Sequence, residues 1–99
     1  MKTLDITAKE WFDKVNGNSY FAGEIIIDYG MDSQKRIVMP FDYGYGNYYE
    51  QEAKAILTEH NYISTVYGQS LHTYCNDNGI IFRSNKEKNC KKTELKNFK

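Results

Sequence analysis

The stretch from Pro40 to Leu57, PFDYGYGNYYEQEAKAIL, constrains the fold more than any other part of the chain. Its second half has apolar residues at helical spacing, which predicts an amphipathic helix packing one face on a sheet. The predicted face consists of Tyr49, Ala53, Ile56, Leu57 and His60. Asn47 is a favourable N-cap, and Glu50 follows it at capping-box spacing. Pro40 cannot donate to a strand ladder, so we expect this end of the preceding strand to lie at a sheet edge or beyond its last pairing.

Between that strand and the helix, Tyr43-Gly44-Tyr45-Gly46 alternates rings with glycines that accept positive φ. Two interpretations stay open. The glycines make a tight turn while the rings cap the core, or the loop holds rings outward as anchors for a partner. Because Tyr43 and Tyr45 point the same way in extended geometry, we expect at least one of them to be exposed. The candidate partner-binding residues are Tyr43, Tyr45, Tyr48, Asp42 and Glu50.

The first half of the chain predicts a helix followed by a β-hairpin. Thr7 and Glu10 have the spacing of a capping box, which predicts a helix over about residues 8–15. Alternating apolar residues predict strands over 19–28 and 35–41, joined by a hairpin loop at 29–34. Gly23, inside the first strand, indicates a bulge or the close approach of another backbone.

After the central helix, Ser70 to Gly79 is compatible with a helix capped by Ser70 or with a strand ending in a turn. The helix is favoured because Leu71, Tyr74 and Cys75 share one helical face. A third strand follows at residues 80–83. Together these elements predict an α+β fold with a small antiparallel sheet of about three strands and two or three short helices, in the order α-β-β-α-(α)-β. The predicted domain spans residues 1–84, and residues 85–99 form a basic, partly ordered tail.

The overall charge is neutral, but basic residues gather near the C-terminus. From Arg83 onward, seven basic residues face two acidic ones. Such a patch can contact a phosphate backbone, or it can simply keep a solvated tail soluble. The candidate nucleic-acid contacts are Arg83, Lys86, Lys88, Lys91 and Lys92.

No residue pattern points to catalysis, a cofactor or a metal. Ser, His and Asp residues are present without a nucleophile-elbow sequence, and YGYGN matches no phosphate-binding loop. His72, Cys75 and Cys90 lack a fourth ligand and zinc-like spacing. We therefore expect a protein that is not an enzyme and holds neither cofactor nor metal.

The N-terminus has no apolar signal-peptide region, and no run of residues is long enough to span a membrane. Cys75 and Cys90 have no CxxC spacing, which predicts two free thiols in a reducing compartment. These features predict a cytoplasmic location, without contact to a membrane.

Three segments together, WFDKVNGNSYF, PFDYGYGNYYEQEA and LHTYCNDNGIIFRSNKEKNCKK, resemble a group of small uncharacterised proteins encoded by bacteriophages and prophages. The resemblance covers most of the chain, but the group has no assigned activity and no site residues that can be transferred. It implies a location in the bacterial host's cytoplasm. It also implies a role common among small phage proteins, which is to bind and redirect host machinery, including defence systems such as CRISPR effectors.

The function expected from these observations is a non-enzymatic phage or mobile-element accessory protein that binds a host protein. Inhibition of a host defence system, as by an anti-CRISPR protein, is one form of that role. The alternative is a small nucleic-acid-binding module that uses the basic tail and exposed tyrosines as stacking platforms.

Overall fold

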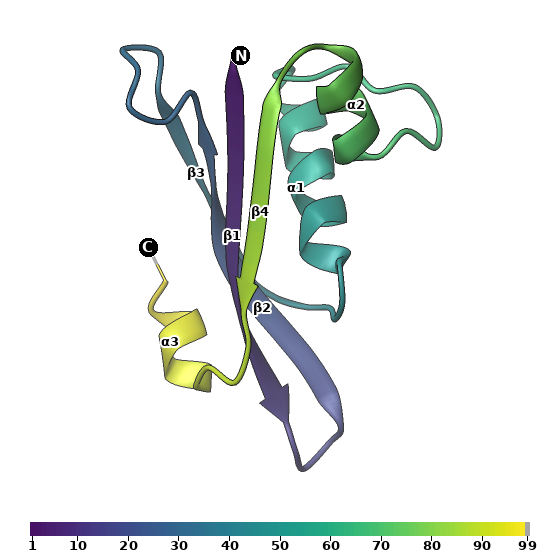
Figure 1. The fold of residues 1–99 in the computed structure, drawn as a ribbon. Coiled ribbons are helices and arrows are strands. Elements are labelled where there is room, and N and C mark those ends of the chain that lie inside the picture. The colour runs from purple at the N-terminus through teal and green to yellow at the C-terminus, as the bar shows by residue number, and fades with distance from the viewer. Residues whose placement is uncertain (99) are drawn as a thin grey trace.

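The computed structural model describes residues 1–98 and shows an α+β domain with a four-stranded sheet (Figure 1). The elements in chain order are β1 (Thr3–Asp13), β2 (Asn18–Ile27), β3 (Lys35–Tyr43), α1 (Tyr48–Glu59), α2 (Leu71–Asp77), β4 (Ile81–Glu87) and α3 (Lys92–Lys96). The strand order is β3-β2-β1-β4. β2 pairs antiparallel with β1 and β3, whereas β4 pairs parallel with β1. The predicted α+β class is confirmed. The predicted three-stranded antiparallel sheet and the element order are wrong.

The largest error concerns the first element, which is a central strand and not a helix over residues 8–15. In β1, Leu4, Ile6 and Ala8 alternate into the core, and the strand pairs with β2 on one side and β4 on the other. Thr7 lies opposite Glu24 and Asn85, so it caps no helix. A strand with two neighbours satisfies its backbone groups in two ladders, and this outweighs the local preference of a capping box.

The hairpin of β2 and β3 agrees with the sequence prediction. The register shifts between Phe21 and Gly23, as expected for a bulge. A Cβ at Gly23 would lie 2.1 Å from the Thr7 carbonyl oxygen, so the two backbones approach too closely for any side chain. Pro40 lies exposed in β3, at the sheet edge where its missing N–H costs least.

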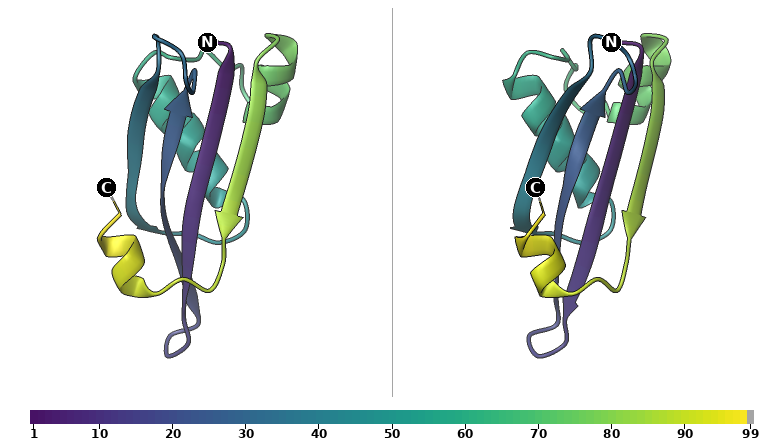
Figure 2. Two further views of the ribbon diagram at one scale, coloured as in Figure 1. Left: turned by 60° about the vertical axis from the view of Figure 1, so that its left-hand side comes forward. Right: turned by 90° about the vertical axis from the view of Figure 1, so that its left-hand side faces the viewer.

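The main core lies between the sheet and the two helices α1 and α2, which cover one face (Figures 1 and 2). It is built from strand residues such as Leu4, Ile25 and Met39 and helix residues such as Leu57 and Leu71. Tyr49, Ala53 and Leu57 form the buried face of α1 as predicted, whereas His60 is exposed just beyond its end.

The opposite face of the sheet carries α3 (Figure 2). Leu95 and Cys90 are buried there against Ala22, next to a ring stack of Trp11, Tyr20 and Phe41. The segment expected to be a basic tail thus contains the end of β4 and the whole of α3. Lys99, the last residue of the predicted tail, lies outside the described residues.

The two helices on the main face begin differently. Ser70 is the N-cap of α2, where its Oγ accepts a hydrogen bond from the Thr73 N–H at 3.2 Å. The helical interpretation of residues 70–79 is therefore confirmed. Asn47 occupies the N-cap position of α1, but its side chain makes no capping hydrogen bond, so the predicted capping box with Glu50 does not form.

Candidate functional site

The loop from Tyr43 to Tyr48, called the tyrosine loop below, joins β3 to α1 and is built on Gly44. The Gly44 N–H donates to the Ser19 carbonyl oxygen at 3.0 Å, which ties the loop to β2. A Cβ on Gly44 would lie 2.6 Å from the Tyr48 ring and 3.0 Å from Phe21. Glycine is therefore required there so that the Tyr48 ring can pack over the backbone.

The three tyrosines of this loop are exposed, with 51% of Tyr43, 69% of Tyr45 and 41% of Tyr48 accessible to solvent. The expectation that at least one of Tyr43 and Tyr45 is exposed is confirmed for both. Tyr43 packs edge-on against Tyr20, while Tyr48 packs against Phe21. Tyr20 and Phe21 are successive strand residues and point to opposite faces of the sheet. Tyr43 and Tyr48 therefore pack on opposite faces of the sheet, at the end where the loop joins β3 to α1.

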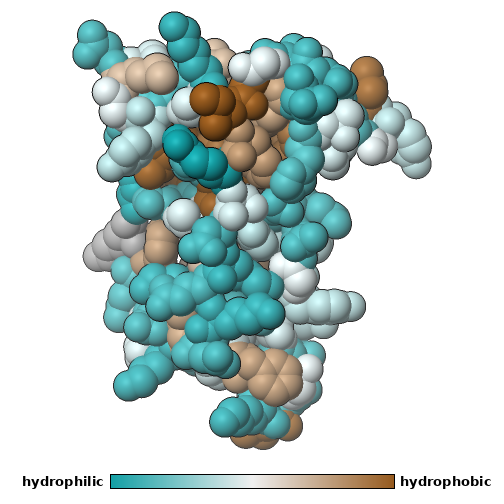
Figure 3. Space-filling model, viewed as in Figure 1, coloured by the Kyte–Doolittle hydropathy of each residue, from teal (hydrophilic) through white to brown (hydrophobic). Residues whose placement is uncertain are grey.

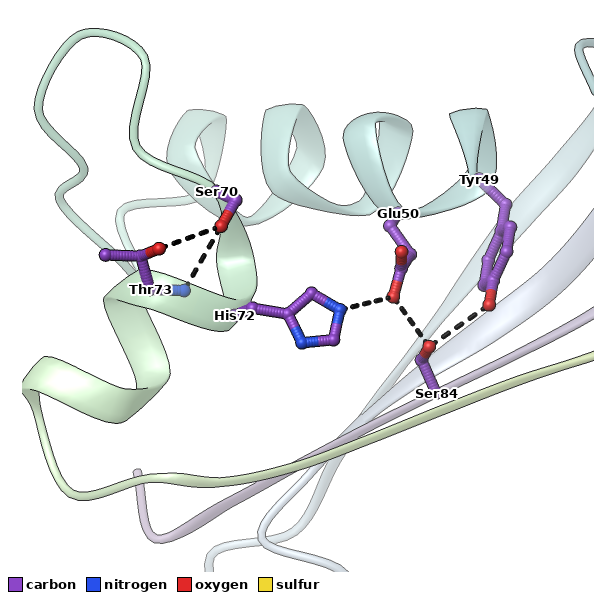
Figure 4. A network of polar contacts seen from close by, with 6 residues as sticks. All are labelled: Tyr49, Glu50, Ser70, His72, Thr73 and Ser84. Atoms are coloured by element: carbon purple, nitrogen blue, oxygen red, sulfur yellow. Dashed lines mark hydrogen bonds and ion pairs between the residues drawn. The ribbon is translucent and has the colours of Figure 1, made fainter. Parts of the chain in front are cut away.

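The two acidic residues predicted beside these rings have different surroundings. Asp42 is exposed, and its Oδ1 accepts a hydrogen bond from the Tyr43 N–H at 2.8 Å. Glu50 points inward instead, with only 13% of its side chain exposed. Its Oε2 accepts a hydrogen bond from Ser84 Oγ at 2.6 Å and lies 3.2 Å from His72 Nε2 (Figure 4).

Glu50 is the centre of a polar network that sequence reasoning missed. Ser84 Oγ also lies 3.1 Å from the Tyr49 hydroxyl, so the network joins α1, α2 and β4 (Figure 4). A serine nucleophile needs a histidine within reach of its hydroxyl to take the proton. Here the carboxylate of Glu50 lies between Ser84 and His72. The arrangement fits a hydrogen-bond network that holds α1, α2 and β4 together better than it fits a hydrolytic triad.

The five predicted nucleic-acid contacts do not share one surface. Arg83 makes a bidentate pair with Asp5 at 2.6 and 3.0 Å, and this hydrogen bonding raises the Arg83 pKa. Lys86 lies on the other face of β4, where its Nζ is 2.5 Å from Glu10 and 2.8 Å from the Gly46 carbonyl oxygen.

The other three lysines of that set are exposed. The Lys92 Nζ lies over the Trp11 ring at 5.4 Å from its centroid. Lys88 and Lys91 lie in the segment between β4 and α3.

Figure 3 shows hydrophilic residues covering the region around α3 and hydrophobic ones gathered over the upper part of β1 and β4.

Two hollows adjoin along α1. One of about 840 Å³ lies between α1 and the segment of residues 65–72, and one of about 560 Å³ lies beside the tyrosine loop. Asn47 and Gln51 line both hollows, so the two meet at these residues, and together they are called the α1 groove below. Only the apolar pair Val66-Tyr67, in a segment without periodicity, hints at this surface in the sequence.

Both cysteines are free, and they lie in the two separate cores on opposite faces of the sheet. Burial raises the pKa of each thiol, and the carboxylate of Glu87 adds to this effect at Cys90. Neither thiol is therefore suited to act as a nucleophile or a metal ligand at neutral pH.

Among residues 1–98, no three His, Cys, Asp or Glu side chains are grouped as a metal ion would require. Within the same part of the chain, no helix combines the length and apolar character needed to cross a membrane. Comparison of the chain with protein-family models, with curated proteins and with solved structures finds no match.

Proposed function

We propose that the protein is a non-enzymatic binding protein that docks onto another protein through the tyrosine loop. The observation that carries this proposal is the exposure of Tyr43, Tyr45 and Tyr48 on a loop held in place by the buried backbone of Gly44. Tyrosine is enriched at interfaces because it supplies a large contact area at low conformational-entropy cost. A loop ordered before binding also avoids part of the entropic cost of association.

The resemblance to phage and prophage proteins supports a host protein as the partner. Under this proposal the chain is an accessory protein of a phage or mobile element acting in the bacterial cytoplasm. Inhibition of a host defence system, as by an anti-CRISPR protein, is the form of this role that the resemblance implies. The polar network around Glu50 favours binding over catalysis, because Ser84 Oγ donates to the Glu50 carboxylate and has no histidine beside it.

The nucleic-acid alternative has weaker support. Arg83 and Lys86 each have a carboxylate partner and lie on opposite faces of β4. The observation that favours nucleic-acid binding is the exposure of Lys88 and Lys91, which makes both available to a phosphate backbone.

The test is capture of the partner from a bacterial lysate with immobilised wild-type protein, a Tyr45→Ala variant and a Tyr29→Ala variant. Tyr29 is a matched control, because it is 63% exposed but belongs to the turn between β2 and β3. We expect Tyr45→Ala to weaken capture by about 2 kcal/mol or more, as at an interface hot spot. Tyr29→Ala should capture the same protein as wild type, and both variants should melt like wild type.

The proposal would be overturned if the Tyr43→Ala, Tyr45→Ala and Tyr48→Ala variants were all folded and all captured the partner as well as wild type does. A lower melting temperature for the Tyr45 variant would show instead that the ring belongs to the core.

A further inference from the structure

The helix layer of this protein is acidic although the chain as a whole is neutral. Residues 42–80 contain five acidic side chains and one basic one, which gives this region a formal charge of −4 and leaves +4 for the rest. The acidic residues are Asp42, Glu50, Glu52, Glu59 and Asp77, and Lys54 is the basic one. Of these six residues, Glu50, Lys54 and Glu59 line the α1 groove, which gives its lining a formal charge of −1. The other carboxylates of the region add to a negative field that attracts a cationic occupant and repels a nucleic acid.

Glu59 belongs to this groove and contributes nothing favourable to its own helix. It is an exposed residue at the C-terminus of α1, and the last turn has no basic side chain. Negative charge at a helix C-terminus opposes the helix dipole. As an exposed lining residue, Glu59 is available to a cationic ligand in the groove.

Two apolar residues that the core does not use, called the rim residues below, follow the groove residue Thr65 in the chain. Val66 is 69% exposed and Tyr67 is fully exposed; neither lines the groove itself, but both of their chain neighbours, Thr65 and Gly68, do. The loop that holds them is ordered by its own hydrogen bonds. The Val66 N–H donates to Gln69 Oε1, and Gln69 Nε2 reaches Asp77 Oδ2 in α2.

The length of the groove suits a peptide segment. The 12 residues of α1 span about 18 Å at about 1.5 Å per residue. An extended peptide covers that distance with about five or six residues. Tyr45 and Tyr48 lie toward one end of the groove, and the rim residues Val66 and Tyr67 lie toward the other.

We infer that the α1 groove binds a short basic segment of the partner protein, with lysine or arginine residues on Glu59 and apolar residues against Val66 and Tyr67. This inference rests on the proposed function and names the chemistry of the partner. Such a segment is of the kind that other proteins use to contact phosphates, so binding here would compete with nucleic acid for it.

The test measures fluorescence anisotropy of a short labelled peptide of lysine, arginine and leucine. The comparison peptide has glutamate in place of each cation. Glu59→Lys is the groove variant, and it should fold because a cation suits a helix C-terminus. Glu87→Lys is the matched control. This substitution makes the same charge reversal on β4, away from the groove. Ser84 faces α1, where it bonds to Glu50, and Glu87 lies on the other face of the strand, next to Lys9.

We expect wild type to bind the basic peptide and not the glutamate peptide. Glu59→Lys should weaken binding by about five- to thirtyfold, since an exposed attraction becomes a repulsion. Tyr67→Ala should also weaken binding, and Glu87→Lys should leave it nearly unchanged.

Equal binding of the two peptides, or equal binding by wild type and Glu59→Lys, would overturn the inference. So would tighter binding of a DNA oligonucleotide than of the basic peptide. Self-association of the wild type that Glu59→Lys abolishes would make a second copy the occupant and would also overturn it. If the basic peptide fails to bind while Tyr45→Ala still weakens partner capture, the inference fails and the proposed function stands.

Discussion

A single residue, Asp28, joins the start of the chain to the end of β2. It is 7% exposed and has a positive φ of 54°. Its Oδ1 accepts hydrogen bonds from the N–H groups of Lys2 and Thr3 at 2.6 and 3.2 Å, and its Oδ2 accepts one from Ser33 Oγ at 2.9 Å. These bonds, that of the Lys2 N–H above all, lower the pKa of Asp28.

Because the folded protein holds this carboxylate at a lowered pKa, its ionised form stabilises the native state. That contribution is complete above the unfolded pKa of about 3.9 and is lost as the pH falls through the lower folded value. We expect Asp28→Asn, which keeps tolerance of positive φ, to lower the melting temperature at pH 7. The difference from wild type should narrow in acid, as thermal melts between neutral pH and about pH 2 would show.

Asp32→Asn is the control for this measurement, since Asp32 is exposed in the same turn. A gap between wild type and Asp28→Asn that stays constant with pH would show that the charge of Asp28 is not what stabilises the turn.

At the scale of elements, α1 and α2 show that a residue suited to capping does not always cap. Ser70 has extended dihedral angles that let its side chain bond to the Thr73 N–H. Asn47 has φ −92° and ψ 12°, which keeps its side chain from the helix N-terminus. Glu50, its expected partner in a capping box, is held by Ser84 and His72 instead. Tertiary contacts thus replaced a local motif.

This contrast yields a pair of matched substitutions. Ser70→Ala removes a capping hydrogen bond and should reduce the free energy of unfolding by about 0.5–2 kcal/mol. Asn47→Ala removes no such bond and should cost clearly less. Chemical denaturation of both variants, with wild type alongside, measures the two values. Equal losses would contradict the difference in capping that the structure shows.

At the scale of the whole molecule, the sheet separates two surfaces of different charge. The helix layer is acidic, whereas α3 and the segment before it carry exposed lysines. Arg83 and Lys86 add little to the basic surface, because Asp5 and Glu10 neutralise them.

With Lys88, Lys91 and Lys92 as the remaining candidates, we expect only weak nucleic-acid binding, with a Kd of about 10⁻⁴–10⁻⁶ M at physiological salt. The logarithm of the affinity should fall against that of salt concentration with a slope of about −3 or shallower. Titrations of a DNA oligonucleotide at several salt concentrations measure this slope. Lys88→Gln should reduce it by about one unit. Tight, sequence-selective binding that persists at high salt would favour the nucleic-acid function over protein binding.

The sequence by itself determined the elements whose signals are local. The spacing of Tyr49, Ala53 and Leu57 predicted α1, and alternation with a turn at residues 29–34 predicted the β2–β3 hairpin. Gly23 marked the bulge, because a glycine weakens a strand interior and is typical of places where the ladder is interrupted or another backbone comes close. The exposure of Tyr43 and Tyr45 followed from strand geometry and the neighbouring glycines.

The tertiary structure alone decided the features that depend on distant partners. Residues 3–13 form a strand because β2 and β4 flank them, and the β4 residues that pair with β1 lie 78 positions further along the chain. Leu95 and Cys90 order the last segment only because they pack against Ala22 and the Trp11 ring stack on the second face of the sheet. Glu50 likewise joins Ser84 and His72, and residues 65–72 complete the α1 groove, through contacts between segments that no local pattern encodes. Burial and backbone pairing between remote segments contribute more free energy than a capping motif, so they decide where the two disagree.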